Sequence, residues 1–311
     1  MKFIVTTTIN SPTKATIKYC KLAKEKNWKL IIVGDTKTPH EQYKSLTKEF
    51  GNCIEYLEPE RQSEEYKEIS DLIGWKTIQR RNIGFLHANK NGAEIVATVD
   101  DDNIPYDNWG DEILLNKEVE VDVYKNTSVD VFDPLSVTNH KNLWHRGYPI
   151  EYLQNKNDVL YLGKRKIIPL IQADLWDGDP DIDAMARLSL KPMVKFDVVS
   201  PFASSQISPF NSQNTFIHID ALKYYAVWPY VGRMDDIWGG YYLQSVLGPY
   251  RLIYNKATVY QDRNEQDLVK NLENEVIGYR NTLNFVKDIN IKKSYIPDET
   301  KKFLDLYFNK F

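Results

Sequence analysis

Apolar and polar residues alternate along the first hundred residues in a pattern that predicts strands separated by helices. Residues 2–8 are rich in β-branched side chains, and residues 30–33 form an all-apolar run typical of a parallel strand covered on both faces. A further apolar strand is predicted at 95–99. Helical spacing predicts helices in four stretches: up to about residue 25, then 40–50, 61–73 and 77–90. This alternation indicates an α/β protein with a parallel sheet and right-handed crossovers.

The periodicity weakens between about residues 110 and 215, where prolines punctuate short predicted strands. Regular patterns then return, and they predict a helix at 235–247, a strand at 250–260 and helices at about 265–288 and 297–310. No linker, low-complexity tract or internal repeat separates the two parts of the chain. We therefore expect one domain over residues 1–311.

Three consecutive aspartates, Asp100, Asp101 and Asp102, follow the apolar run at 95–99. A strand that ends in Asp-x-Asp places two carboxylates on the same side of the chain, at the sheet edge where α/β proteins bind ligands. Two hard oxygen ligands suit Mg²⁺ or Mn²⁺, whose remaining ligands are usually water and substrate phosphate oxygens. The pattern predicts a metal-bridged diphosphate, and the alternative is a polar turn continued by Asn103.

Charge and cysteine content narrow the classes of function. The chain has 40 Lys and Arg against 43 Asp and Glu, a net charge of -3, so no basic excess favours a nucleic-acid partner. Cys20 and Cys53 are too few for a disulfide framework or a thiolate metal site, which indicates a reducing compartment. No apolar stretch has the length of a signal peptide or a bilayer span. These features predict a cytoplasmic protein without a transmembrane segment.

Other polar residues lie where a nucleotide site would need them. Thr7 and Asp35 lie at the ends of the first two strands, where hydrogen bonds to a base or ribose are expected, although strand ends are commonly polar. Arg80, Arg81 and Asn82 lie on the helix before the aspartates. A guanidinium binds phosphate or carboxylate in bidentate fashion, so either arginine is a candidate partner of a phosphate or of Asp100, and a solvated helix face is the alternative.

The stretch from Arg233 to Gly240 begins a helix with two carboxylates, Asp235 and Asp236. The helix dipole alone favours carboxylates in a first turn. Successive helical residues point about 100° apart, so we expect only one of the two aspartates to face inward, where it could act as general base on a sugar hydroxyl. The glycines after Trp238 suggest close backbone packing or the approach of a ligand.

Four stretches in order resemble a known family: Val99–Asp102, Arg146–Pro149, Leu175–Ala184 and Arg233–Gly240. The sequence resembles the reversibly glycosylated polypeptides, whose plant members are UDP-arabinopyranose mutases. They belong to the nucleotide-diphospho-sugar glycosyltransferases of the GT-A fold, which also include the STELLO-type proteins. The resemblance implies a Rossmann-like α/β fold with a central mixed sheet flanked by helices. It also implies a nucleotide-binding half at 1–110, a sugar and acceptor half at 111–265, and C-terminal helices at 266–311.

The resemblance also implies roles for single residues. Asp100 and Asp102 would hold Mn²⁺ or Mg²⁺ on the donor diphosphate, with Asp101 directed elsewhere on the donor side. Arg146 corresponds to the arginine that becomes reversibly glycosylated, and the alternative is a loop arginine paired with a phosphate or a carboxylate. Asp235 and Asp236 would lie near the acceptor. Candidates for the walls and hydrogen bonds around the sugars are Trp176, Asn214 and Trp238. Asn255 stands where the family has a histidine, and its amide oxygen would be a weaker metal ligand than imidazole.

We expect a metal-dependent glycosyltransferase that uses a nucleotide-diphospho-sugar, with UDP as the expected nucleotide, and an acceptor that the sequence does not identify. Arg80 or Arg81 could share the charge of the leaving diphosphate. Two alternatives stay open: a mutase that interconverts the pyranose and furanose rings of a UDP-sugar, and a non-catalytic protein that binds nucleotide-sugars. The sequence leaves a homo-oligomeric state open.

Overall fold

A computed structural model describes residues 1–263 and 265–311 of the chain. Within these ranges one sheet holds all eleven strands, in the order β3-β2-β1-β4-β10-β8-β11-β9-β6-β7, with β5 paired to β11. The strands are β1 (Lys2–Thr8), β2 (Lys29–Gly34), β3 (Ile54–Leu57), β4 (Ile95–Val99), β5 (Asn103–Pro105), β6 (Val119–Asn126), β7 (Val159–Ile167), β8 (Ile171–Gly178), β9 (Phe202–Ser204), β10 (Asn214–His218) and β11 (Leu252–Gln261).

The sheet is mixed, as predicted. Strands β3, β2, β1 and β4 are parallel, which confirms the expectation for the first hundred residues. Strand β10 runs antiparallel to β4 and β8, whereas β11 is parallel to β8. The carboxyl ends of β1, β2, β4, β8 and β11 consequently meet along one edge of the sheet, because β10 reverses direction between two parallel groups.

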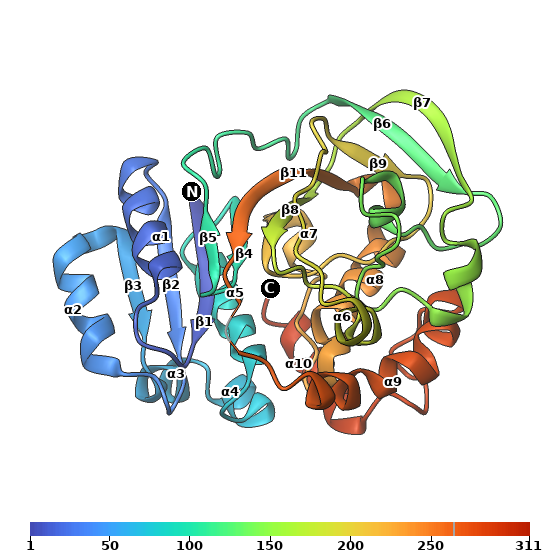
Figure 1. Ribbon diagram of the computed structural model, residues 1–311. Coiled ribbons are helices and arrows are strands. Elements are labelled where there is room, and N and C mark those ends of the chain that lie inside the picture. The colour runs from blue at the N-terminus through green and yellow to red at the C-terminus, as the bar shows by residue number, and fades with distance from the viewer. Residues whose placement is uncertain (264) are drawn as a thin grey trace.

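Ten α-helices lie in the described ranges, and they flank the sheet (Figure 1). They are α1 (Lys14–Glu25), α2 (His40–Phe50), α3 (Pro59–Glu65), α4 (Lys67–Ile73), α5 (Arg81–Lys90), α6 (Ala184–Leu190), α7 (Ile219–Leu222), α8 (Asp235–Leu247), α9 (Leu268–Lys287) and α10 (Asp298–Phe308). The single helix expected over 61–73 is in fact two, α3 and α4, separated at Tyr66. None of the described helices has the length and apolarity needed to cross a membrane.

Alternating residues of the strands fill two cores on opposite faces of the sheet. In β1, Ile4 belongs to the core that contains α1, whereas Phe3 and Val5 belong to the core that contains α5 and α8. This is the two-residue periodicity expected of a strand buried on both faces. The two cores hold the strand ends, and the polar residues that follow them, at fixed positions along the edge.

The glycines of α8 serve helix packing. A Cβ at Gly239 would overlap the carbonyl oxygen of Ala226, and one at Gly240 would lie 2.7 Å from the ring of Phe210. Of the two explanations suggested by the sequence, close packing and the approach of a ligand, the structure shows close packing. Through these contacts the N-terminal part of α8, which carries Asp235 and Asp236, packs closely against the rest of the protein.

Candidate active site

A cavity of about 270 Å³ lies at the carboxyl ends of β1, β2 and β4. Residues that line it include Thr7, Thr8, Asn10, Asp35, Arg80 and Asp101. The structure thus brings together Thr7, Asp35, Arg80 and Asp101, four residues that the sequence predicted for donor binding. One carboxylate oxygen of Asp35 accepts hydrogen bonds from the backbone amides of Lys76 (2.6 Å) and Thr77 (3.2 Å), so Asp35 fixes one wall of the cavity.

The three aspartates after β4 have three different environments. Asp100 forms an ion pair with Arg81 at 2.5 Å. Asp101 accepts hydrogen bonds from the hydroxyl of Thr8 and from the side-chain amide of Asn10. The buried Oδ1 of Asp102 has no hydrogen-bond partner among the described residues. Asp102 is consequently the carboxylate that most needs a ligand, because an unpaired buried oxygen costs free energy.

Burial, and next the negative charge of Asp100, raise the pKa of Asp102 to about 7. A buried carboxylate beside a second negative charge is well suited to a divalent cation, which would neutralise both groups. Within residues 1–263 and 265–311 no group of three or more His, Cys, Asp or Glu side chains could hold a metal ion by itself. The donor set therefore fits Mg²⁺ or Mn²⁺ that obtains its remaining ligands from water and phosphate.

The two neighbouring arginines, Arg80 and Arg81, make different contacts. Arg81 donates to Asp100, to both oxygens of Ser212 and, at 3.4 Å, to the hydroxyl of Thr7. Arg80 points elsewhere: its guanidinium lies 3.4 Å from the ring centre of Trp75 and donates to the carbonyl oxygen of Gly74. Arg80 thus stabilises the segment before α5 and reaches the cavity only as part of its wall.

Four of the predicted donor-site residues instead lie in the protein interior. They are at most 3% exposed: Asn82, Trp176, Asn214 and Trp238. The amide of Asn82 bonds the backbone of Gln79 and Val227, and that of Asn214 bonds Thr258. Trp238 donates to Thr282 beneath α9. The sequence shows that these residues are polar or aromatic, but their burial depends on which elements pack over them.

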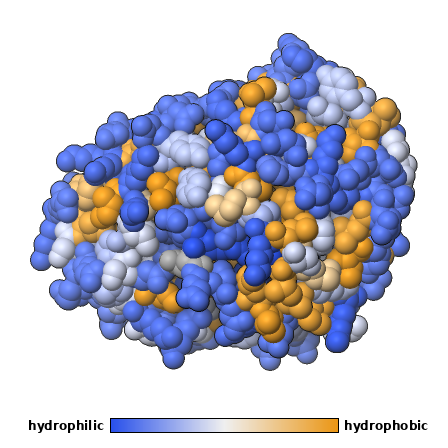
Figure 2. All heavy atoms as spheres, in the orientation of Figure 1, coloured by the Kyte–Doolittle hydropathy of each residue, from blue (hydrophilic) through white to orange (hydrophobic). Residues whose placement is uncertain are grey.

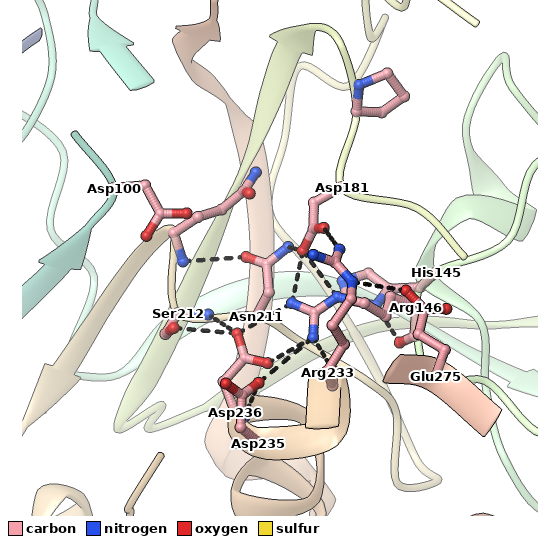
Figure 3. Close-up of polar contacts among 12 residues, drawn as sticks. Asp100, His145, Arg146, Asp181, Asn211, Ser212, Arg233, Asp235, Asp236 and Glu275 are labelled. Carbon is pink, nitrogen blue, oxygen red and sulfur yellow. Dashed lines mark hydrogen bonds and ion pairs between the residues drawn. The ribbon is translucent and has the colours of Figure 1, made fainter. Parts of the chain in front are cut away.

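A buried cluster of ionic groups surrounds Arg146 (Figure 3). Its guanidinium makes five hydrogen bonds, to Asp181, Asp236 and the carbonyl oxygen of Arg233. All five of its N–H groups thereby have acceptors. Beside it, His145 is buried, and burial lowers its pKa to about 4, so the imidazole is neutral at physiological pH.

Both aspartates of α8 face inward, and the expectation that only one would do so was wrong. Asp235 is 7% exposed and Asp236 is 4% exposed. Burial opposes ionisation of Asp236, yet the charge of Arg146 holds its pKa below the ordinary value. Burial, and next the charge of Asp236, raise the pKa of Asp235 to about 7. Asp236 also accepts hydrogen bonds from the amide and hydroxyl of Ser212.

Ser212 connects the two predicted parts of the site. Its hydroxyl lies 2.9 Å from Arg81, the partner of Asp100, and 3.0 Å from Asp236. A continuous chain of polar contacts therefore runs from the acidic tip, which is residues 100–102 after β4, to the first turn of α8. The sequence-based prediction did not include Ser212, because nothing in the segment around it indicates this bridging position.

The sequence-based prediction missed several charged residues of the cluster. Asp181 accepts hydrogen bonds from Arg146, Asn211 and Arg233, and Arg233 also bonds Glu275. Arg263 is the second residue after the end of β11 and lies 3.7 Å from Asp181. Arg263 could have been found by the argument used for the aspartates, since polar residues just after a parallel strand lie at the ligand-binding edge.

The structure separates Asn255 from the other predicted metal ligands. Gln261, at the far end of β11, pairs with Asn103 next to Asp102, whereas Asn255 lies six residues earlier and pairs with Asp174. At about 3.3 Å per residue, roughly 20 Å of strand lies between these positions. Asn255 lines a different cavity, together with Asp174 and Thr258. The prediction that it is a metal ligand with Asp100 and Asp102 is therefore corrected.

The buried Asp174 predicts an unusual dependence of stability on pH. Burial raises its pKa to about 7, against about 4 in an unfolded chain. The native state therefore binds the extra proton between these values, so this group's contribution to stability falls as pH rises from about 4 to about 7. We expect Asp174→Asn, which mimics the protonated form, to raise the free energy of unfolding by roughly 2–4 kcal/mol at pH 8 and to change it little at pH 4.

Urea denaturation at the two pH values measures this effect. The exposed Asp71, which pairs with Lys67 on α4, provides a control because Asp71→Asn removes the same charge without burial. A destabilised Asp174→Asn variant at pH 8 would contradict the prediction.

Comparison with known proteins yields remote relatives. No protein-family model matches the chain. It is similar to two proteins of Arabidopsis thaliana, probable glycosyltransferase STELLO2 and probable glycosyltransferase STELLO1. Each is 25% identical over 295 residues, with 85% of this chain covered. The chain spans 36% of the length of each of these relatives.

Similar solved structures include glucosyl-3-phosphoglycerate synthase from Mycobacterium tuberculosis in complex with phosphoglyceric acid, with 11% identity and a TM-score of 0.45. That match covers 96% of this chain and 81% of the other. Another is S. aureus TarS 1–349, with 12% identity and a TM-score of 0.44, covering 100% of this chain and 80% of the other.

Proposed function

We propose that this chain is a metal-dependent glycosyltransferase of the GT-A type whose donor is a nucleotide-diphospho-sugar, with a UDP-sugar as the expected donor. The observation that carries the proposal is the pair Asp100 and Asp102 at the carboxyl edge of the sheet, beside a cavity, with a buried oxygen on Asp102 that has no hydrogen-bond partner among residues 1–263 and 265–311. The similarity to two proteins named probable glycosyltransferases supports the same class of reaction.

The chain's own residues have distinct parts in this proposal. Asp100 and Asp102 would hold Mg²⁺ or Mn²⁺, which supplies Lewis-acid stabilisation of the leaving diphosphate when bound. Thr7, Asp35 and the neighbouring backbone amides would contact the nucleoside in the 270 Å³ cavity. Arg81 lies behind Asp100 and orients its carboxylate. This arrangement leaves the acceptor to bind farther along the edge, toward β8 and β11.

Asp236 is the candidate general base for the acceptor hydroxyl. It is ionised because Arg146 lowers its pKa, and Ser212 joins it to the partner of Asp100. Its Oδ1 accepts a hydrogen bond from Arg146 at 2.9 Å, and its Oδ2 accepts from Arg146 and Ser212. Because Asp236 is only 4% exposed, an acceptor hydroxyl would reach it only after these contacts rearrange. Asp235 accepts a hydrogen bond from the amide of Gln79, and its other oxygen lies 3.7 Å from Arg146.

The contacts of Arg146 favour the transferase over the mutase. A mutase that works through a glycosylated arginine needs a guanidinium nitrogen that is accessible and able to lose a proton. Arg146 is 6% exposed, and although burial lowers its pKa, Asp181, Asp236 and Asp235 raise it well above its ordinary value. Its five N–H groups are all engaged. We therefore assign Arg146 to positioning Asp236.

A thermal-shift titration with UDP, with and without Mn²⁺, tests the donor proposal. A ligand that binds only the native state raises the melting temperature. At a ligand concentration one hundred times the dissociation constant, it adds about 2.7 kcal/mol to the free energy of unfolding. We expect UDP to stabilise the protein with Mn²⁺ and to do so far less with EDTA. Product chromatography with UDP-sugars then separates the activities: nucleotide release upon acceptor addition indicates a transferase, a ring isomer without acceptor indicates a mutase, and binding without turnover indicates a non-catalytic protein.

A further inference from the structure

A second cavity lies at the same edge of the sheet, beyond Asp102 as seen from β1. It measures about 300 Å³ and is lined by residues that include Asp179, Arg187, Lys191, Arg263 and Glu265. Asp179 follows β8, and Arg263 follows β11. Strand β8 is three strands from β1 in the sheet, so roughly 14 Å separates this cavity from the one at β1 and β2. Figure 2 shows strongly hydrophilic residues near the middle of the molecular face that it draws.

The guanidinium of Arg263, in this second cavity, is buried without direct acceptors among the described residues for two of its nitrogen atoms. Its side chain is 8% exposed, and its Nε and Nη2 atoms have no hydrogen-bond partner within the described part of the chain. These two atoms form the side edge of the guanidinium, which binds carboxylate and phosphate through two parallel hydrogen bonds. The nearest carboxylate oxygens lie 3.9 Å away on Asp179 and 3.7 Å away on Asp181, which is too far for a hydrogen bond.

Those two carboxylates are already occupied by other arginines. Asp179 pairs with Arg187. Asp181 accepts hydrogen bonds from both Arg146 and Arg233. Both carboxylates therefore already have arginine partners, and the two atoms of Arg263 lie beyond hydrogen-bond distance of them. An arginine buried without an acceptor is costly. The exposed Lys191 adds a further positive charge to those of Arg187 and Arg263 around the cavity.

We propose that this cavity binds an oxyanion, a carboxylate or phosphate group carried by the acceptor, and that the side edge of Arg263 is its principal ligand. That the anion belongs to an acceptor rests on the proposed transferase function, whereas the binding of an anion rests on Arg263 alone. Its position supports the acceptor: the backbone amide of Asp262 bonds the carbonyl oxygen of Asp102, so Arg263 lies close to Asp102. Strand β11, which precedes it, lies on the other side of β4 from β1 and β2, whose ends form the nucleoside cavity. The acceptor class is thus an acidic sugar, a sugar phosphate or another small phosphorylated or carboxylated alcohol.

Titration of the full chain with inorganic phosphate at low ionic strength, by calorimetry, tests the anion site. We expect phosphate to bind, and Arg263→Gln to weaken it about tenfold or more, because a charge-assisted hydrogen bond to a buried group is lost. Arg263→Lys keeps the charge and loses the fork, so it should also weaken binding and covers the case in which the glutamine variant fails to fold. Arg165→Gln, an exposed arginine on β7, is the matched control and should leave phosphate binding unchanged.

Two outcomes would overturn the proposal. Equal phosphate affinity in the parent and in both Arg263 variants would show that Arg263 is no ligand. Displacement of phosphate by UDP with Mn²⁺ would assign the anion site to the donor diphosphate, whereas simultaneous binding supports the acceptor. If UDP with Mn²⁺ does not bind, the proposed transferase function fails, and the acceptor assignment fails with it, while the comparison of Arg263 variants still decides the anion site.

Discussion

Replacement of Asp102 by asparagine is expected to lower the metal-stimulated release of UDP from a UDP-sugar by about 10³-fold, because charge neutralisation at a leaving diphosphate is worth several kcal/mol. The fold should survive the change. Burial and the charge of Asp100 already raise the pKa of Asp102 to about 7, and asparagine resembles the protonated form that the buried environment favours. Loss of activity with an unchanged melting temperature would separate a metal ligand from a structural residue.

The measurement is UDP release over a range of Mn²⁺ concentrations, with Asp107→Asn as the control. Asp107 lies five residues after Asp102 and its side chain is 98% exposed in an ion pair with Lys18, so its replacement removes the same charge without touching the site. Asp100→Asn should resemble Asp102→Asn in lost activity but should also free Arg81 from its partner. The metal proposal would be wrong if Asp102→Asn kept the parent's activity and its response to Mn²⁺.

The sequence predicted the strand-end half of this site because that half depends on local patterns. The strands that end at Thr8, Gly34 and Val99 have strong apolar signals, and parallel strands bring their carboxyl ends to one edge whatever the rest of the chain does. The strand pattern alone was therefore enough to place Thr7, Asp35 and the three aspartates together. The edge also continues to β8 and β11, where the same argument leads to Arg263.

The ionic cluster could not be predicted because its contacts join distant parts of the chain. Arg146 and Asp181 are 35 residues apart, and Arg146 and Asp236 are 90 residues apart. No periodicity carries that information. The expectation that only one of Asp235 and Asp236 would be buried assumed a helix with one buried side, but α8 is covered more completely, so both side chains lie inside.

Asn255 shows how a strand can be identified correctly and its register missed. The strand predicted at 250–260 exists as β11, yet its carboxyl end at Gln261, and not its middle at Asn255, meets the acidic tip. A single apolar strand contains no mark of where its neighbours end, since that depends on pairing with β5 and β8. Burial of Trp176 and Trp238 was equally beyond a reading of local pattern.

Replacement of Arg146 by methionine is expected to lower the free energy of unfolding by about 3–5 kcal/mol, since removal of one partner leaves buried carboxylates without compensation. Asp181 and Asp236 have side chains only 5% and 6% exposed, and Arg146 bonds both. The loss should be largest at pH 8. In the parent, Arg146 counters the effect of burial and holds the pKa of Asp236 below its ordinary value, so this carboxylate stabilises the fold above about pH 4 and less as pH falls below it.

Without Arg146 the sign of that dependence reverses. Burial then raises the pKa of Asp236 above the unfolded value, so stability falls as pH rises from about 4, and the variant should be closest to the parent in acid. Urea denaturation of Arg146→Met at pH 5 and pH 8 measures this, and adding Asp236→Asn should restore more than about 1 kcal/mol at pH 8, since residues in contact couple. An Arg146→Met variant as stable as the parent at pH 8 would contradict the view that Arg146 neutralises the carboxylates around it, and would reopen its assignment as a residue available for glycosylation.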